Sequence, residues 1–302
     1  MDFQADLFAA TRRTTRHGLT VLELIICLGT IGVLTTLVLP AVQSVREATR
    51  RFQCVDHLRQ VGLAIHEFES GSKHIPAGWS FDTERSSSYG WAVSLLPYVG
   101  DSGLVDGVDP KQAVTATRHD IARGTSLPWT ICPSDIIEPT FEIFYDEDGP
   151  VASLIAPAAP MTVSLTQLPT ANYVGVFGTI EPDDSIPAPL GDGAFVEMRQ
   201  TRLKDFSRGL SQTVIVGERT MAQVPSTWLG VPLEGEDAAA RLVGSTLQGI
   251  NNSLADECDF SSRHSGGANF LWADGHVSLI SQSIDLMEYH RIPRLRNFDP
   301  SK

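Results

Sequence analysis

The stretch RHGLTVLELIICLGTIGVLTTLVLP, residues 16–40, decides the architecture of this chain. Sixteen residues from Leu24 to Leu39 carry no charge, and the apolar residues on either side extend the run to the roughly 20 residues that span a bilayer. A removed secretion signal has a shorter apolar core, of about 7–15 residues, before its cleavage site. The length therefore favours a retained membrane helix over a removed signal.

Charges around this stretch predict its orientation. Arg12, Arg13 and Arg16 precede the apolar run, so we expect the N-terminus to stay in the cytoplasm and the rest to be exported. One carboxylate, Glu23, lies near the start of the run, where a charge costs less than at the bilayer centre. Two interpretations stay open: Glu23 is tolerated at headgroup level, or it pairs with a cation inside a helix assembly.

An amphipathic helix is predicted to continue from the membrane segment. A proline inside a helix removes a backbone hydrogen bond, so Pro40 predicts a kink. Beyond it we expect Gly71 to lie just past the helix end, which gives one helix of about 50 residues and about 75 Å. Apolar side chains recur at spacings of three and four, at Val42, Val45, Ala48, Phe52, Val55, Leu58, Gly62, Ile65 and Phe68.

The chain beyond Gly71 predicts a β-rich domain with many turns. Most of the 18 prolines and 25 glycines lie there, between short apolar runs. Residues 172–178 and 213–218 predict buried strands, and residues 91–98 fit a short helix or a strand equally well. Residues 137–170, rich in acidic residues, alanine and proline, predict an insertion or a long loop.

A hairpin is predicted near the C-terminus. Asp274-Gly275 separates two apolar runs, and both turn positions are expected to have positive φ. The strands would be residues 269–273 and 276–280. The residues expected on the packed face are Phe270, Trp272, Val277 and Leu279.

Composition argues against several functions. The net charge is −13 with no long basic run, which argues against nucleic-acid binding. Neither CxxC nor HExxH occurs, so we expect no metal site and no cofactor. His264 and Asp274 could form a catalytic or metal-binding pair, but no nucleophile in a recognisable context accompanies them. The favoured interpretation is structural: Asp274 accepts backbone hydrogen bonds in its turn, and His264 ties the preceding loop to the sheet.

The four cysteines are too few for a disulfide scaffold. Cys27 lies in the membrane segment and is expected to pack as a small apolar residue. The other three would lie outside the cytoplasm, where disulfides persist. Cys54 and Cys132 are a candidate disulfide that would join the helix to the head. Cys258 would then be free and buried, or the true partner of one of the other two.

The segment Gly18-Leu19-Thr20-Val21-Leu22-Glu23 resembles the cleavage and methylation motif of type IV pilins and pseudopilins. The resemblance implies that prepilin peptidase cuts between Gly18 and Leu19 and that the new N-terminus is methylated. Leu19 departs from the usual phenylalanine, which leaves its methylation open. Glu23 becomes the fifth mature residue, whose carboxylate neutralises the N-terminal amine of a neighbouring subunit. Pro40 matches the position where the family's long helix bends.

His264, nine further residues and then Asp274-Gly275 match the H-X9-DG region that closes the DUF1559 family of pilin-like proteins, abundant in planctomycetes. The chain resembles this family at further points, in the same order along the sequence. The resemblance implies a pilin-like long helix joined to a β-rich head, and it supplies no activity. The other matching stretches are residues 40–43 (PAVQ), 51–54 (RFQC), 132–135 (CPSD), 172–175 (NYVG) and 216–218 (VGE).

Together these features predict an α+β protein with a long N-terminal helix packed on a β-rich head. The predicted parts are a leader (1–18), a transmembrane helix (19–42), an amphipathic helix (43–70) and a head (71–302) that ends in the H-X9-DG hairpin (262–281).

The leading functional hypothesis is a non-enzymatic pilin-like or pseudopilin-like subunit. It would cross the inner membrane once, with the head extracytoplasmic, and reach the cell surface after assembly. Its expected partners are prepilin peptidase, the lipid bilayer and other pilin-like subunits. The alternatives are a membrane-tethered module that binds a solute, glycan or protein, and a hydrolase that uses His264 and Asp274.

Overall fold

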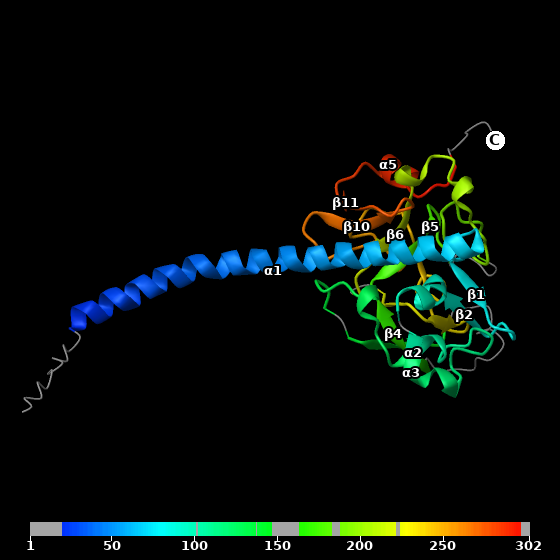
Figure 1. Cartoon of the computed structure of the whole chain (residues 1–302), viewed down its shortest axis with the longest axis horizontal. Helices are drawn as coiled ribbons and strands as arrows, with labels where there is room; N and C mark the ends of the chain where they lie inside the picture. Colours follow the sequence, from blue (N-terminus) through cyan, green and yellow to red (C-terminus); the bar gives the residue numbers. More distant parts are fainter. Residues whose placement is uncertain are drawn as a thin grey trace, which may run out of the picture. The chain divides into compact units, whose positions relative to one another are not determined.

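The computed structural model describes residues 20–100, 102–136, 138–146, 163–182, 188–221 and 224–296. It confirms the predicted α+β class, because a long helix α1 (Val21–Ser72) is followed by a head built mainly from β-sheets (Figure 1). The chain divides into two compact units, Met1–Ala48 and Thr49–Lys302, with the boundary inside α1. The two units are described separately below.

In the first unit, α1 begins with a capping box. The backbone N–H and the hydroxyl of Thr20 donate to Oε2 of Glu23 at 2.8 and 2.9 Å, and the Glu23 N–H donates to the Thr20 hydroxyl at 3.3 Å. The helix continues past Pro40. Its apolar side chains up to Ala48 are exposed, and the helix is long and apolar enough to cross a membrane. Gly18 and Leu19 lie outside the described residues.

Within the second unit, α1 packs one face into the head. Its fully buried side chains include Cys54, Leu58, Val61 and Ile65, at spacings of four, three and four. The predicted stripe was correct at Leu58 and Ile65 but wrong at Phe52, which is 75% exposed. Phe52 and Leu63, both exposed, lie on the side of the helix opposite Cys54.

The end of α1 also differs from the prediction. The helix runs through Gly71 to Ser72, and Lys73 takes the left-handed conformation with φ of 66°. The Lys73 N–H donates to the Glu69 carbonyl at 2.7 Å, which satisfies one of the last helical acceptors. Gly71 is therefore inside the helix, and a lysine occupies the position for which glycine was expected.

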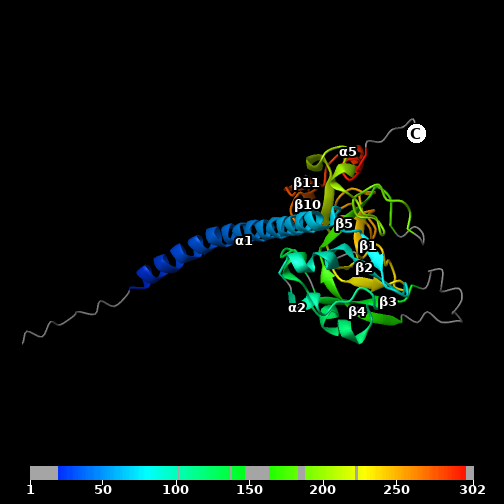
Figure 2. The same ribbon diagram turned by 45° about the vertical axis from the view of Figure 1, so that its right-hand side comes forward.

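Within the described residues the strands of the head form three sheets, and Figure 2 shows the head from a second side. The strands are β1 (Trp79–Phe81), β2 (Ser87–Gly90), β3 (Thr140–Phe144), β4 (Ser164–Ala171), β5 (Tyr173–Gly178), β6 (Val214–Glu218), β7 (Ser226–Thr227), β8 (Gly230–Pro232), β9 (Val243–Ser245), β10 (Gly267–Trp272) and β11 (Val277–Ser281). Their spatial orders are β1-β2-β8, β11-β10-β6-β5-β9 and β3-β4-β7. Neighbouring strands are antiparallel except for β5 and β9.

Short helices connect these strands. The α-helices are α2 (Ser102–Val105), α3 (Asp120–Arg123) and α5 (Leu286–Arg291). The 3-10 helices are η1 (Trp91–Tyr98), η2 (Thr117–His119), η3 (Pro128–Thr130), η4 (Leu203–Asp205) and η5 (Leu210–Gln212). The segment 91–98, which the sequence left open between helix and strand, is therefore the 3-10 helix η1.

The five-stranded sheet is buried on both faces. Val174, Val214 and Phe270 point into a core that Tyr289 of α5 completes. Side chains on the opposite face, such as Leu271, join the core that contains Leu58 of α1. Burial on both faces explains why β5 and β6 are almost continuously apolar, and the structure confirms both as buried strands.

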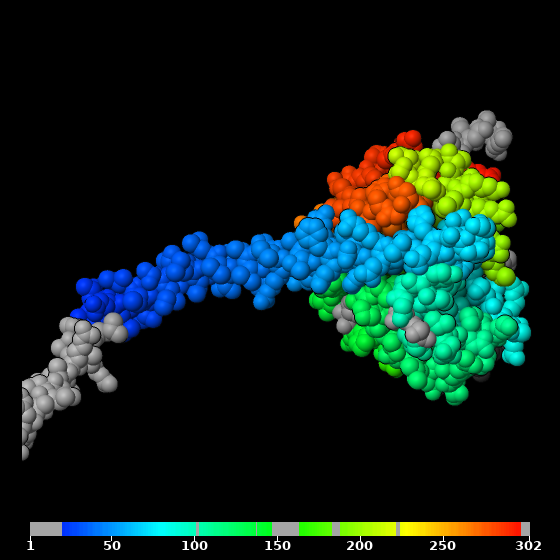
Figure 3. Space-filling view, in the orientation of Figure 1, coloured from blue at the N-terminus to red at the C-terminus, as the bar shows by residue number. Residues whose placement is uncertain are grey.

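Helix α1 approaches the sheet closely at a glycine. A Cβ built on Gly62 would lie 2.9 Å from Cδ1 of Leu271 in β10. In Figure 3 the part of α1 that belongs to the head lies between the C-terminal hairpin and the segments around residues 90–130. This close packing brings Cys54 of α1 toward the strands of the same unit.

Part of the segment 137–170, predicted to be an insertion or a long loop, is strand. β3 and β4 pair within it from Thr140↔Pro169 to Phe144↔Ser164, so the long-loop interpretation was wrong. Phe141 and Ile143 alternate with exposed or half-buried neighbours in β3, as in a strand with one buried face. Proline and acidic residues further along the segment obscured this short pattern. Residues 147–162 lie outside the described residues.

The C-terminal hairpin exists, but its turn and faces differ from the prediction. The Trp272 N–H donates to the His276 carbonyl at 2.9 Å, so the loop has three residues. Gly275 has φ of 92°, whereas Asp274 does not have positive φ. The extra loop residue changes the register: Leu271 pairs with Val277, and Phe270 pairs with Ser278. Phe270 and Val277 therefore lie on opposite faces rather than on one packed face.

Candidate functional site

Four buried ionisable side chains meet inside the head. The ligand-type atoms of Cys54, Cys132, Glu218 and His264 all lie within 4.8 Å of one another. The four residues are between 0 and 5% exposed. They come from α1, from the loop after η3, from the end of β6 and from the loop before β10. We call these four residues the buried cluster.

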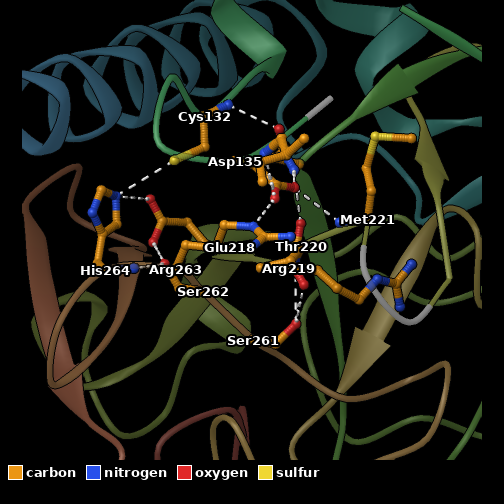
Figure 4. Close-up of polar contacts among 12 residues, drawn as sticks. Cys132, Asp135, Glu218, Arg219, Thr220, Met221, Ser261, Ser262, Arg263 and His264 are labelled. Atoms are coloured by element: carbon orange, nitrogen blue, oxygen red, sulfur yellow. Dashed lines mark hydrogen bonds and ion pairs between the residues drawn. The ribbon is translucent and has the colours of Figure 1, made fainter. Parts of the chain in front are cut away.

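Two members of the buried cluster, Cys132 and Glu218, contact the same ring nitrogen of His264. Nε2 of His264 lies 3.4 Å from Sγ of Cys132 and 3.4 Å from Oε1 of Glu218 (Figure 4). The Sγ atoms of Cys54 and Cys132 lie 2.6 Å apart, and both cysteines are unbridged. A cysteine–histidine–acid triad needs the nucleophile and the acid on different ring nitrogens. Because both partners here contact Nε2, this geometry does not fit such a triad.

The sheet fixes the position of Glu218. The register of β6 against β10 pairs Gly217 with Phe270, which places Glu218 beside Asn269. Oε2 of Glu218 accepts from the Asn269 N–H at 2.8 Å and from the Ser262 hydroxyl at 3.0 Å. Oε1 accepts from the Asn269 side-chain amide at 3.0 Å. These three donors offset the cost of burying the carboxylate and fix its orientation.

Burial, hydrogen bonding and charge shift the pKa values of His264 and Cys132. Burial lowers the pKa of His264, but hydrogen bonding to Cys132 and Glu218 and the negative charge of Glu218 outweigh it and raise the pKa to about 10. The contact with the Cys54 thiol and burial raise the pKa of the Cys132 thiol well above its usual range. These shifts favour the protonated forms of the His264 imidazole and of the Cys132 thiol.

A polar network holds the backbone of Cys132. The Cys132 N–H donates to Oδ1 of Asn172 at 2.9 Å, and the Asn172 amide donates to Oδ2 of Asp135 at 2.8 Å. Oδ1 of Asp135 accepts from Nε of Arg263 at 2.6 Å. Residues of this network and of the buried cluster line a small pocket, and Figure 4 draws several of these residues. Among the described residues that line it, none is aromatic.

The structure places the predicted site residues in two groups. His264, Cys54 and Cys132 come together in the buried cluster, so the candidate disulfide partners are adjacent, and the bond between them stays a prediction. Asp274 instead contacts His276, whose N–H donates to Oδ1 at 3.1 Å and whose Nδ1 lies 2.6 Å away. The remaining head cysteine, Cys258, is buried elsewhere, 1% exposed.

Sequence reasoning missed Glu218 and Asn172 as members of this site. A glutamate at the end of an apolar strand and an asparagine before one carry no spacing that points to His264. The signal was indirect. The stretches RFQC, CPSD and VGE, which carry the family resemblance, each supply one residue of the buried cluster, and the H-X9-DG stretch supplies His264. NYVG supplies Asn172 to the adjoining network.

The fold defines a class of protein with an exposed apolar N-terminal helix and a folded β-rich head. The chain belongs to the family described as "Protein of unknown function (DUF1559)", which matches residues 43–287. This confirms the family resemblance found in the sequence. No curated protein matches the chain, and no solved structure matches it.

Proposed function

We propose that this protein is a pilin-like subunit that its N-terminal helix holds in the membrane before assembly. The observation that carries the proposal is the first part of α1. It is an uncharged apolar helix beyond Glu23 whose most apolar 18-residue window is 0% buried, and the same helix continues into the core of the head. Exposed apolar surface of this extent needs a bilayer or neighbouring helices to cover it.

Processing between Gly18 and Leu19 by prepilin peptidase is part of this proposal, with residues 1–18 as the leader. The motif that supports it lies between the arginines and the apolar run. The mature protein would cross the inner membrane once, with its head extracytoplasmic, and would assemble with other pilin-like subunits. The head then has a structural role rather than an enzymatic one. The contacts of Nε2 of His264 support this, because they do not fit a catalytic triad.

The capping box at Thr20 makes the proposed role of Glu23 testable. Glutamine at this position can accept the same Thr20 hydrogen bonds without a charge, so Glu23→Gln keeps the cap and removes only the charge. Thr20→Ala removes the hydroxyl of the cap and keeps the charge of Glu23. If Glu23 neutralises the amine of a neighbouring subunit, Glu23→Gln and Glu23→Ala lose the high-mass assemblies, whereas Thr20→Ala keeps them. Chemical crosslinking of intact cells, followed by size analysis, measures these assemblies.

The opposite ranking would contradict the assembly role. If Thr20→Ala abolishes the assemblies and Glu23→Gln retains them, Glu23 acts only as a helix cap. Membrane extraction at high pH serves as the control, because every variant should remain in the membrane pellet with the wild type.

A membrane-tethered module that binds a solute, glycan or protein is the alternative. An aromatic-lined concave pocket in the head would favour it. The pocket beside Cys132 is small and has no aromatic lining, so it gives this alternative no support.

A further inference from the structure

We propose that the buried cluster is a zinc site in which Sγ of Cys54, Sγ of Cys132, Nε2 of His264 and Oε1 of Glu218 bind one Zn²⁺. The proposal departs from the expectation of no metal site. That expectation came from the absence of closely spaced ligand motifs, whereas these four residues come together only through the tertiary fold. It does not depend on the proposed assembly of the protein.

The donor types select a thiophilic divalent cation. Two thiolates, one imidazole and one carboxylate form a mixed S, N and O set of the kind that Zn²⁺ accepts. Mg²⁺ and Ca²⁺ prefer sets made only of oxygen. The bound ligands are thiolates and a neutral imidazole, so binding releases the protons that the thiols and the imidazole carry in the free protein. Four protein ligands close the coordination shell, as in a structural zinc site.

The distances agree with a tetrahedral site along two edges. Bond lengths of about 2.3 Å to sulfur and about 2.0–2.1 Å to nitrogen and oxygen give tetrahedral edges of about 3.6 Å for S–N and about 3.4 Å for N–O. The corresponding distances from His264 are 3.4 Å to Cys132 and 3.4 Å to Glu218. The edge between the two sulfurs, now 2.6 Å, must widen by about 1 Å to reach its tetrahedral value of about 3.8 Å.

Neighbouring groups hold the ligands in place. Asn269 and Ser262 fix the Glu218 carboxylate, and Asn172 holds the backbone of Cys132. Outer hydrogen bonds of this kind orient metal ligands and raise affinity. The four donor atoms lie within 4.8 Å of one another, close enough to share one ion. An ion there would join α1 to three segments of the head that are distant in sequence.

Zinc content and metal spectroscopy of the full-length protein test this proposal. The protein is extracted in detergent under reducing conditions, stripped with a chelator, equilibrated with ZnCl₂ and washed. We expect about one zinc per chain by elemental mass spectrometry. We also expect Co²⁺ in place of zinc to give the visible bands of a tetrahedral ion and a thiolate charge-transfer band. His264→Gln should bind zinc at least tenfold more weakly.

Matched controls separate loss of a ligand from loss of the fold. Cys258→Ala removes a buried cysteine outside the cluster and should keep one zinc per chain, whereas Cys54→Ala should not. Circular dichroism of each variant shows whether the head is folded. If Cys54→Ala fails to fold, the Co²⁺ spectrum of the wild-type protein decides the question alone.

Two results would overturn the proposal. One is a zinc content near zero in the folded wild-type protein after equilibration. The other is protein purified without reductant whose Cys54 and Cys132 peptides are disulfide-linked and whose reduced form takes up no Zn²⁺ or Co²⁺. In that case the two cysteines form the disulfide that the sequence suggested, and the site is not a metal centre.

Discussion

Buried carboxylates in the head owe their stability to different partners. Glu218 accepts three hydrogen bonds, one from a serine hydroxyl and two from Asn269. Asp259, fully buried, accepts hydrogen bonds from the backbone N–H groups of Gln248 and Asp256 at 2.9 and 3.2 Å. Burial outweighs these bonds and raises the pKa of Asp259 to about 6.

Asp259 predicts a pH dependence of stability. Its pKa is higher in the folded state than the 3.8 of an unperturbed aspartate, so its stabilising contribution is complete below pH 3.8 and is lost as the pH rises through about 6. Asp259→Asn removes this titration. Between pH 5 and pH 7.5, the free energy of unfolding of the wild type should fall by about 1 kcal/mol relative to that of the variant.

Urea unfolding of both proteins at the two pH values measures this difference. A difference between wild type and variant that stays constant from pH 5 to pH 7.5 would show that Asp259 has an ordinary pKa. A difference with the opposite sign would show that its backbone hydrogen bonds dominate over burial.

At the scale of elements, α1 combines two environments in one helix. Its first part is apolar and exposed up to Ala48, and the part from Thr49 buries one face in the head. Leu58 is fully buried, whereas Leu63 is 62% exposed on the same helix. This pair allows the same substitution to be compared on two faces of one helix.

Leu58→Ala should destabilise the head by about 2–5 kcal/mol, because it leaves a cavity in the core beside the five-stranded sheet. Leu63→Ala is the matched control and should change the free energy of unfolding by less than about 0.5 kcal/mol. Leucine and alanine have similar helix propensities, so the comparison isolates packing. Urea unfolding of the detergent-solubilised proteins measures both. Equal effects would mean that the buried face of α1 has been assigned wrongly.

Sequence patterns predicted the elements with strong periodicity and failed where several elements meet. β5 and β6 were predictable because a strand buried on both faces is continuously apolar. The exposed Phe52 was not, because two successive spacings of three place it about 120° around the helix from the buried Leu58. The hairpin register depended on one extra loop residue at Asp274-Gly275. The partners of His264 were not predictable, because Glu218 lies beside it only through tertiary packing.

For the molecule as a whole, three features bear on its function: the apolar N-terminal helix, the β-rich head and the family to which the chain belongs. The chain belongs to the DUF1559 family, and its N-terminal helix could serve as a membrane span. The head has a well-packed core and a buried cluster that receives a side chain from α1. These features are compatible with a membrane-anchored pilin-like protein, in which we propose that the helix carries assembly and that the buried cluster joins α1 to the rest of the head.

The N-terminus of the protein extracted from membranes tests this account most directly. N-terminal sequencing, combined with intact-mass analysis, reads both the cut site and any methyl group on the new amine. Cleavage between Gly18 and Leu19 predicts a chain that begins at Leu19 and retains its apolar helix. A chain that still carries residues 1–18, or one cut beyond the apolar run and released from the membrane, would contradict it.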